Sequence, residues 1–144
     1  MIFDLDGSLG FLLNRTNTKM KNFLLHKFKE YDVTPEQWAI LNRLWVRDGV
    51  SPKELAELTS KDQPNTVRIL TKIENKGFIT RRINSEDNRS FLIYLTPIGR
   101  ELKYSLIPLA YDVLNKATYN IDGNKIEIVK EVLNKIFKNL EAEE

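Results

Sequence analysis

The chain has 144 residues, no cysteine and one histidine, His26. The absence of cysteine excludes disulfides, thiol-based oxidant sensing and zinc sites with cysteine ligands. One histidine cannot build a histidine-rich metal site. We therefore expect no bound metal and no redox chemistry at sulfur.

Long apolar runs are also missing. No stretch approaches the roughly 18 consecutive apolar residues that a membrane-spanning helix needs. The N-terminus lacks the basic segment followed by an uninterrupted apolar segment that is typical of a signal peptide. We therefore expect a cytoplasmic protein without a membrane partner.

Net charge is small, but it is unevenly distributed. The whole chain carries +2, whereas residues 51–100 contain nine Lys or Arg against six Asp or Glu, a difference of +3. Residues 101–144 contain six against eight, a difference of −2. A basic middle segment is typical of a local nucleic-acid footprint, although a solvated charged face has the same composition.

One motif at the N-terminus points to an enzyme. The letters D-L-D-G-S-L, beginning at Asp4, resemble the nucleophile motif of haloacid-dehalogenase-like phosphatases, with Asp4 as nucleophile and Asp6 as acid/base beside Mg²⁺. That chemistry requires a buried strand to aim both carboxylates, and only three residues precede Asp4. A phosphatase is therefore a remote alternative to a polar N-terminal arm.

Apolar periodicity predicts long helices at both ends of the chain. Spacings of three and four run from Ser8 to about Tyr31, and similar patterns follow Thr96 and Asp122. Pro108 should kink the helix that begins at Thr96. These apolar faces are broader than so short a chain can cover, so we expect them to pair in a symmetric dimer.

Capping signals predict three shorter helices between these ends. Thr34 with Gln37 and Ser51 with Glu54 have capping-box spacing, and a proline occupies the first helical position in each case. Asp62 is the N-cap of a third helix, which ends near Gly77.

This third helix has a thin apolar seam of Val67, Leu70 and Ile73. Its other face is polar and cationic, as a helix that enters a DNA major groove requires. With the preceding Ser51–Leu58 helix it predicts a helix-turn-helix. The polar face consists of Asn65, Thr66, Arg68, Thr71, Lys72 and Asn75.

A β-hairpin follows. Residues 78–83 and 91–95 are rich in strand formers and flank a seven-residue polar loop, 84–90. Because most hairpin loops have two to five residues, the length suggests a reaching wing. Arg89 at its tip could enter a minor groove, with Asp87 orienting it. An exposed, flexible hairpin is the alternative.

The predicted fold class is therefore mainly α with a small β-wing, a winged helix-turn-helix flanked by long terminal dimerisation helices. We expect residues 1–32 to contribute to dimerisation, residues 33–100 to bind DNA, and residues 101–144 to complete the dimerisation region.

Five motifs in order resemble the MarR family of transcriptional regulators: V-T-P-E-Q-W-A-I-L from Val33, S-P-K-E-L-A-E-L from Ser51, I-E-N-K-G-F-I from Ile73, D-N-R from Asp87 and L-T-P-I-G from Leu95. The resemblance covers roughly Val33 to Arg100. It implies a homodimer that usually represses nearby genes, and in many members a small, often phenolic, anionic ligand.

Residue roles follow from the helix-turn-helix interpretation and the resemblance together. Base edges would be read by Gln63, Asn65, Thr66 and Arg68. Phosphates would be bound by Ser51, Lys53, Lys61, Thr71 and Lys72, and DNA contacts would also come from Arg81, Asp87 and Arg89. The resemblance implies an effector pocket lined by Phe23, Tyr31, Trp38 and Trp45, aromatics that could equally be core.

We therefore predict a sequence-specific regulator of double-stranded DNA with no catalytic activity and no cofactor. It would be a homodimeric repressor that binds a pseudo-palindromic operator and is released by a small aromatic or anionic effector. The alternative is a winged-helix protein–protein interaction module that faces an acidic partner.

Overall fold

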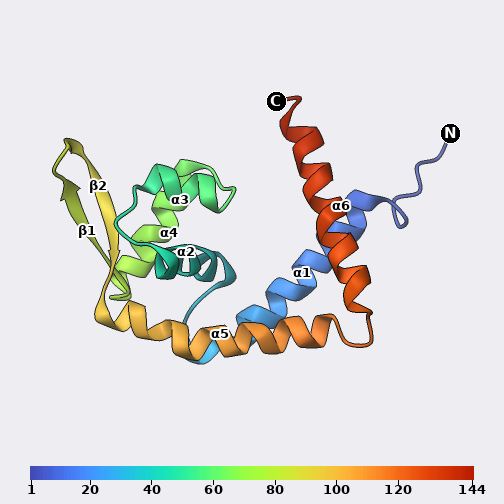
Figure 1. The fold of residues 1–144 in the computed structure, drawn as a ribbon, viewed down its shortest axis with the longest axis horizontal. Coiled ribbons are helices and arrows are strands. Elements are labelled where there is room, and N and C mark those ends of the chain that lie inside the picture. Colours follow the sequence, from blue (N-terminus) through green and yellow to red (C-terminus); the bar gives the residue numbers. More distant parts are fainter.

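The computed structural model describes residues 1–144 as a helical molecule with one two-stranded antiparallel sheet (Figure 1). The prediction of a mainly α fold with a small β-wing is confirmed. The elements are α1 (Leu9–Lys27), the 3-10 helix η1 (Lys29–Tyr31), α2 (Pro35–Val46), α3 (Pro52–Leu58), α4 (Gln63–Asn75), β1 (Ile79–Asn84), β2 (Asp87–Leu95), α5 (Pro97–Ala117) and α6 (Gly123–Glu141).

The elements form two groups joined by α5. Helices α2, α3 and α4 cluster with the β1–β2 hairpin at one end, α5 runs along the base, and α1 and α6 rise at the other end (Figure 1). No helix is both long and apolar enough to cross a membrane.

Side-chain caps set the helix starts, as predicted. Thr34 accepts the N–H of Gln37 at 3.2 Å, and Gln37 Oε1 accepts the N–H of Thr34 at 3.2 Å, so the first capping box is complete. The second is only half formed. Ser51 accepts the N–H of Glu54 at 3.1 Å, but the Glu54 carboxylate pairs with Arg47 instead of returning to Ser51.

The hydrophobic core lies between the α2–α4 cluster, the hairpin and the first half of α5. Ile40, Leu70, Ile93 and Leu106, from four different elements, are fully buried in it. Burial of apolar surface at this junction fixes the orientation of α4 and of the hairpin.

The buried face of α4 is broader than the sequence suggests. Thr66, Ile69, Leu70 and Ile73 are buried, whereas Val67 is only half-buried. Leu70 and Ile73 are buried as predicted, but the predicted seam was too narrow because it omitted Thr66 and Ile69.

The hairpin is longer and its turn shorter than predicted. β1 and β2 pair from Ile79↔Leu95 to Asn84↔Asp87, with an irregularity at Ile83/Asn84. The expected seven-residue loop was wrong, because residues 87–90 belong to β2 and only Ser85 and Glu86 connect the strands.

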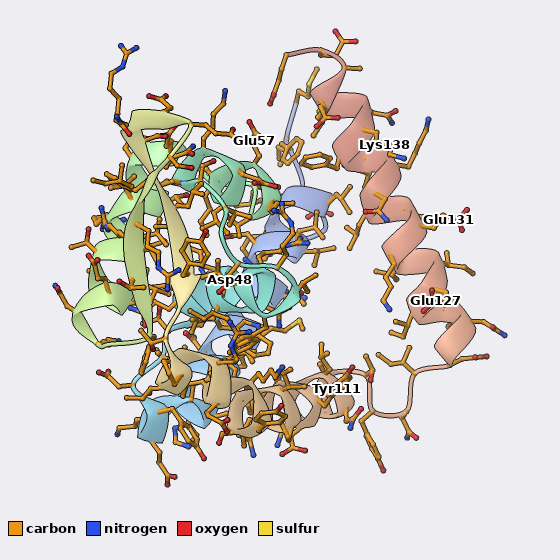
Figure 2. The ribbon with its side chains drawn as sticks, turned by 60° about the vertical axis from the view of Figure 1, so that its left-hand side comes forward. Asp48, Glu57, Tyr111, Glu127, Glu131 and Lys138 are labelled. Carbon is orange, nitrogen blue, oxygen red and sulfur yellow. The ribbon has the colours of Figure 1, made fainter.

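A short contact anchors the base of the hairpin. Val50 forms an antiparallel bridge with Ile93, and Asp48 Oδ2 accepts both the N–H of Leu95 at 3.0 Å and a guanidinium N–H of Arg100 at 3.2 Å. Asp48 therefore connects the end of α2 with β2 and α5, at the position labelled in Figure 2.

The terminal helices bury little surface within one chain, although Leu24 of α1 packs against the core and Lys21 of α1 pairs with Glu36 of α2. Neither α1 nor α6 has a buried residue. Figure 2 shows α6, with Glu127, Glu131 and Lys138 labelled, standing apart from the rest of the chain.

The N-terminal arm gives no support to a phosphatase. Residues 1–5 are exposed and adopt no regular structure, so no buried strand precedes Asp4. The Asp4 carboxylate accepts only the N–H of Gly7, at 3.3 Å.

Candidate nucleic-acid interface

Helices α3 and α4 form the helix-turn-helix. The Asp62 carboxylate caps α4 by accepting the N–H of Asn65 at 2.7 Å, and the N–H of Lys61 donates to the carbonyl of Ala56 at 2.9 Å across the turn. The Lys61–Ala56 hydrogen bond closes the turn between the two helices, which contains no glycine.

The exposed face of α4 is polar and cationic. Gln63, Arg68 and Lys72 are exposed, and Asn65 is half-buried beside them. Arg68 donates to Oδ1 of Asn65 on the same face. Because guanidinium and amide groups make bidentate contacts with base edges, this pair has the chemistry of direct readout.

The hydroxyl groups of two threonines of α4 already donate hydrogen bonds within the protein. Thr66 is 0% exposed and its hydroxyl donates to the carbonyl of Asp62 at 2.9 Å. The prediction that Thr66 reads a base edge was therefore wrong. The Thr71 hydroxyl donates to the carbonyl of Val67 at 3.1 Å, and since a hydroxyl has one proton, none is left for a phosphate in this conformation.

The predicted phosphate contacts of α3 lie at its N-terminus and in the turn. Lys53 is exposed in the first turn of α3, while Ser51 and Lys61 are half-buried. The Ser51 oxygen accepts the N–H of Glu54 and keeps its own proton for another acceptor.

The wing presents Arg89 to solvent. Its side chain is 97% exposed. Asp87 Oδ1 accepts the backbone N–H of Arg89 at 3.1 Å, and the Arg89 Nε atom lies 3.9 Å from the same oxygen. Asp87 thus shapes the backbone at Arg89 more than it orients the guanidinium.

Arg81, in contrast, is sheltered. Its side chain is 23% exposed, and its Nη2 atom donates to Thr71 Oγ1 at 2.9 Å. The structure places it between α4 and the hairpin, unlike Arg89 at the far end of the same hairpin.

One residue that anchors α4 was missed by the sequence-based prediction. Lys76, directly after the last turn of α4, donates to Gln37 Oε1 at 2.9 Å and to the carbonyl of Asp32, whose carboxylate lies 3.5 Å away. A lysine at a helix C-terminus is a general signal for capping carbonyls, but its partners here lie some forty residues earlier in the chain.

The predicted effector pocket is only partly assembled. Trp38 packs against Phe28 and Trp45, with ring centroids 5.2 and 5.5 Å away. Tyr31 and Trp45 pack against the core, and Phe23 lies apart beneath the Lys116 ammonium, which is 5.3 Å from its ring centroid.

Of the four predicted pocket residues, Trp38 alone lines a cavity between α2 and α5, of about 300 Å³. No charged side chain lines it, and its polar groups are those of Trp38, Asn42 and Tyr111. The remaining lining residues are Ile107, Ala110 and Leu114.

The pKa of the Glu36 carboxyl is lowered, chiefly because Lys21 hydrogen-bonds to it, but this pair joins α1 to α2 away from α4. No group of three or more His, Asp or Glu side chains is arranged to hold a metal ion.

Known proteins share this arrangement. The sequence model of the MarR family matches residues 33–91. The organic hydroperoxide resistance transcriptional regulator of Bacillus subtilis (strain 168) is 26% identical over 136 residues, which cover 94% of this chain and 91% of the relative. The multiple antibiotic resistance protein MarR of Salmonella typhimurium is 27% identical over 129 residues, covering 89% and 90%.

Solved structures agree with the sequence comparisons. A mutant of MarR from E. coli complexed with operator DNA superposes with a TM-score of 0.87 at 25% identity, covering 94% of this chain and 98% of that chain. Wild-type MarR from E. coli in its apo form has a TM-score of 0.74 at 25% identity, covering 94% and 98%.

Proposed function

We propose that the chain is a winged helix-turn-helix regulator of the MarR family, and that it is a homodimeric repressor that binds specific double-stranded DNA. One observation carries the proposal. The capped helix α4 exposes Gln63, Arg68 and Lys72 beside a hairpin whose Arg89 is 97% exposed. A helix and a wing with these charges fit a major groove and the adjoining minor groove.

The contacts divide into two classes. Gln63, Asn65 and Arg68 read base edges, because their amide and guanidinium groups match the donor and acceptor patterns of the major groove. Phosphates are held by side chains that position the protein and make its affinity depend on salt. These are Ser51, Lys53, Lys61 and Lys72.

A dimer accounts for the exposed apolar faces of the terminal helices. Exposed apolar side chains line α1 and α6, among them Leu9, Val129, Val132 and Phe137, at 54%, 52%, 49% and 55% exposure. Pairing with a second copy would bury them and favour association. Residues 1–32 and 101–144 then form the dimerisation region and residues 33–100 the DNA-binding domain.

Two-fold symmetry has a consequence for the DNA site. A dimer presents two copies of α4, so its operator is a pseudo-palindrome with half-sites about one helical turn, roughly 10–10.5 base pairs, apart. A protein that represses genes in this way acts on chromosomal DNA in the cytoplasm and requires no cofactor or catalysis.

The cavity between α2 and α5 is the proposed effector site. It is lined by the rings of Trp38 and Tyr111 and by the Asn42 amide, with no charged side chain. A small aromatic ligand with a hydrogen-bonding group fits this lining. Because the cavity joins the DNA-binding domain to the dimerisation helix α5, its occupation would alter the spacing of the two α4 helices.

Selection of bound duplexes from a random library tests the proposed function. We expect enrichment of one pseudo-palindromic sequence by the wild-type protein. Arg68→Ala should relax the preference at one position in each half-site, at a cost of about 1–3 kcal/mol. An unenriched library, or equal weakening of Arg68→Ala on all sequences, would contradict sequence-specific readout by α4.

A further inference from the structure

Arg81 differs from the other two cations of the hairpin, Arg82 and Arg89, in its burial. Its side chain is 23% exposed, although it belongs to the same hairpin as Arg89, which is 97% exposed. A side chain that served only as a phosphate contact would gain nothing from this shelter. Its surroundings therefore indicate a different role.

The Arg81 guanidinium reaches two residues on one face of α4. Its Nη2 atom donates to Thr71 Oγ1 at 2.9 Å, and its Nε atom lies 3.1 Å from Glu74 Oε1. The Nε–H is buried and is not directed at the carboxylate, so the second contact is an ion pair without a directed hydrogen bond. Thr71 and Glu74 are neighbours at i and i+3 on the helix.

The same guanidinium also packs on the second strand. Its central carbon lies 5.1 Å from the centroid of the Phe91 ring, within range of a cation–π interaction. Phe91 pairs with Ile83 across the sheet, so the contact lies outward from the buried base of the hairpin. One side chain of β1 therefore joins α4 to both strands.

The contact lies where the buried base of the hairpin gives way to its exposed outer half, since Arg81 pairs with the buried Ile93. Ile79, Ile93 and Leu95 at its base are buried, but Ile83 is 72% exposed. Beyond the base, Phe91 is only half-buried at the edge of the core, and the Arg81 guanidinium packs on its ring. Arg81 thus adds contacts to α4 and Phe91 at the point from which the outer half, including Arg89, extends.

We propose that Arg81 is a positioning residue that fixes the wing relative to α4. The helix then enters the major groove and the wing the minor groove with their relative orientation already set before DNA binds. The inference rests on the proposed function. Preorganisation of this kind increases affinity by reducing the entropy lost on association. Glu74 and Thr71 contribute to the same positioning, because their side chains are directed at Arg81 and away from DNA.

The two possible roles of Arg81 predict different salt dependence. A phosphate contact releases about one counterion per protomer, so its loss from both protomers of the dimer reduces the magnitude of the slope of log K against log salt by roughly 1.8. A positioning residue releases none, so Arg81→Ala should weaken binding about tenfold with the slope unchanged. Binding of the selected duplex over a range of salt concentrations measures both quantities.

A double-mutant cycle tests the link to the wing. If Arg81 holds the wing, the penalty of Arg89→Ala should fall to less than about twofold in the Arg81→Ala background. Arg82→Ala is the matched control, because it removes the same charge from the next position of β1, where Arg82 lies over the Tyr94 ring at 4.4 Å. In that background the Arg89→Ala penalty should persist.

Glu74→Gln provides a second variant that keeps the cation and removes only its ion-pair partner. It should reduce the Arg89→Ala penalty in the same direction. Additive penalties together with a lower salt slope in Arg81→Ala would overturn the inference and make Arg81 a phosphate contact.

A measurement without DNA separates this inference from the proposed function. In the free protein, backbone amides of residues 80–84 and 89–92 should exchange hydrogen about tenfold faster in Arg81→Ala and Glu74→Gln than in Arg82→Ala. Unchanged exchange would overturn the positioning role even if DNA binds. Faster exchange in a protein that selects no duplex would leave the contact between Arg81 and α4 intact and refute the proposed function.

Discussion

Lys76 Nζ lies 2.9 Å from Gln37 Oε1 and donates to it, which ties the end of α4 to the first turn of α2. Gln37 is 3% exposed, and the same oxygen accepts the N–H of Thr34. Lys76→Met removes a charged donor from a nearly buried acceptor and should lower the free energy of unfolding by about 1–2 kcal/mol. Urea denaturation measures this, and Lys19→Met, at an exposed lysine of α1, is the control. Equal stability of the two variants would contradict the anchoring role.

Gly99 tolerates no side chain. A Cβ atom there would lie 1.9 Å from the carbonyl oxygen of Phe78, a backbone atom that cannot move independently. Gly99→Ala should therefore cost about 3 kcal/mol or more of stability. At Gly10, inside α1, a Cβ atom would have no neighbour within 4 Å, so Gly10→Ala should add about 0.5–1 kcal/mol. Thermal or urea unfolding distinguishes them, and a stable Gly99→Ala variant would refute the close approach of α5 to Phe78.

The Lys21–Glu36 pair should make stability depend on acid pH. Lys21 donates to Glu36 at 2.8 Å and lowers the pKa of that carboxyl. A carboxyl with a lowered folded-state pKa stabilises the protein above its unfolded pKa of roughly 4.3, and this contribution is lost as pH falls through the folded-state pKa. Both side chains are about a third or more exposed, at 45% and 34%, so the effect is small and screened by salt.

Comparison of wild type with Glu36→Gln across this pH range checks the expectation. The wild type should be more stable near neutral pH, and the difference should vanish in acid. A stability difference that stays constant below about pH 3 would show that the ion pair is not its source.

The apolar face of α6 should form part of the dimer interface. Val129 is 52% exposed in the single chain, and Val129→Glu places a charge where the second copy would pack. Sedimentation should then show monomers at concentrations where the wild type is dimeric, with much weaker binding to a palindromic duplex. Asn134→Glu introduces the same charge on the opposite face and should leave the dimer intact. Equal sedimentation of the two variants would exclude α6 from the interface.

Local signals were sufficient for the helix starts. Thr34, Ser51, Asp62 and Thr96 are caps whose hydrogen bonds reach only three residues along the chain, so they can be identified from spacing alone. The winged helix-turn-helix follows from their order.

Interactions between elements far apart in the chain could not be predicted from local sequence patterns. The apolar seam of α4 was thin, and its spacing did not indicate that Thr66 and Ile69 are buried beside Leu70 and Ile73. The polar residues 87–90 indicated a loop, yet they extend β2 into solvent, where strand pairing buries no polar side chain. Arg81 could not be separated from the DNA-facing cations, because its partners Thr71 and Glu74 are set by how the hairpin lies on α4.

Hydroxyl-radical footprinting of the selected duplex tests the joint use of helix and wing most directly. Wild-type protein should protect two half-sites about one helical turn apart, each with a flanking minor-groove segment. Arg89→Ala should lose protection of the flanking segments alone and keep that of the half-sites. Unaltered flanking protection in Arg89→Ala, or a footprint without two-fold symmetry, would contradict a dimer that reads DNA with α4 and the wing together.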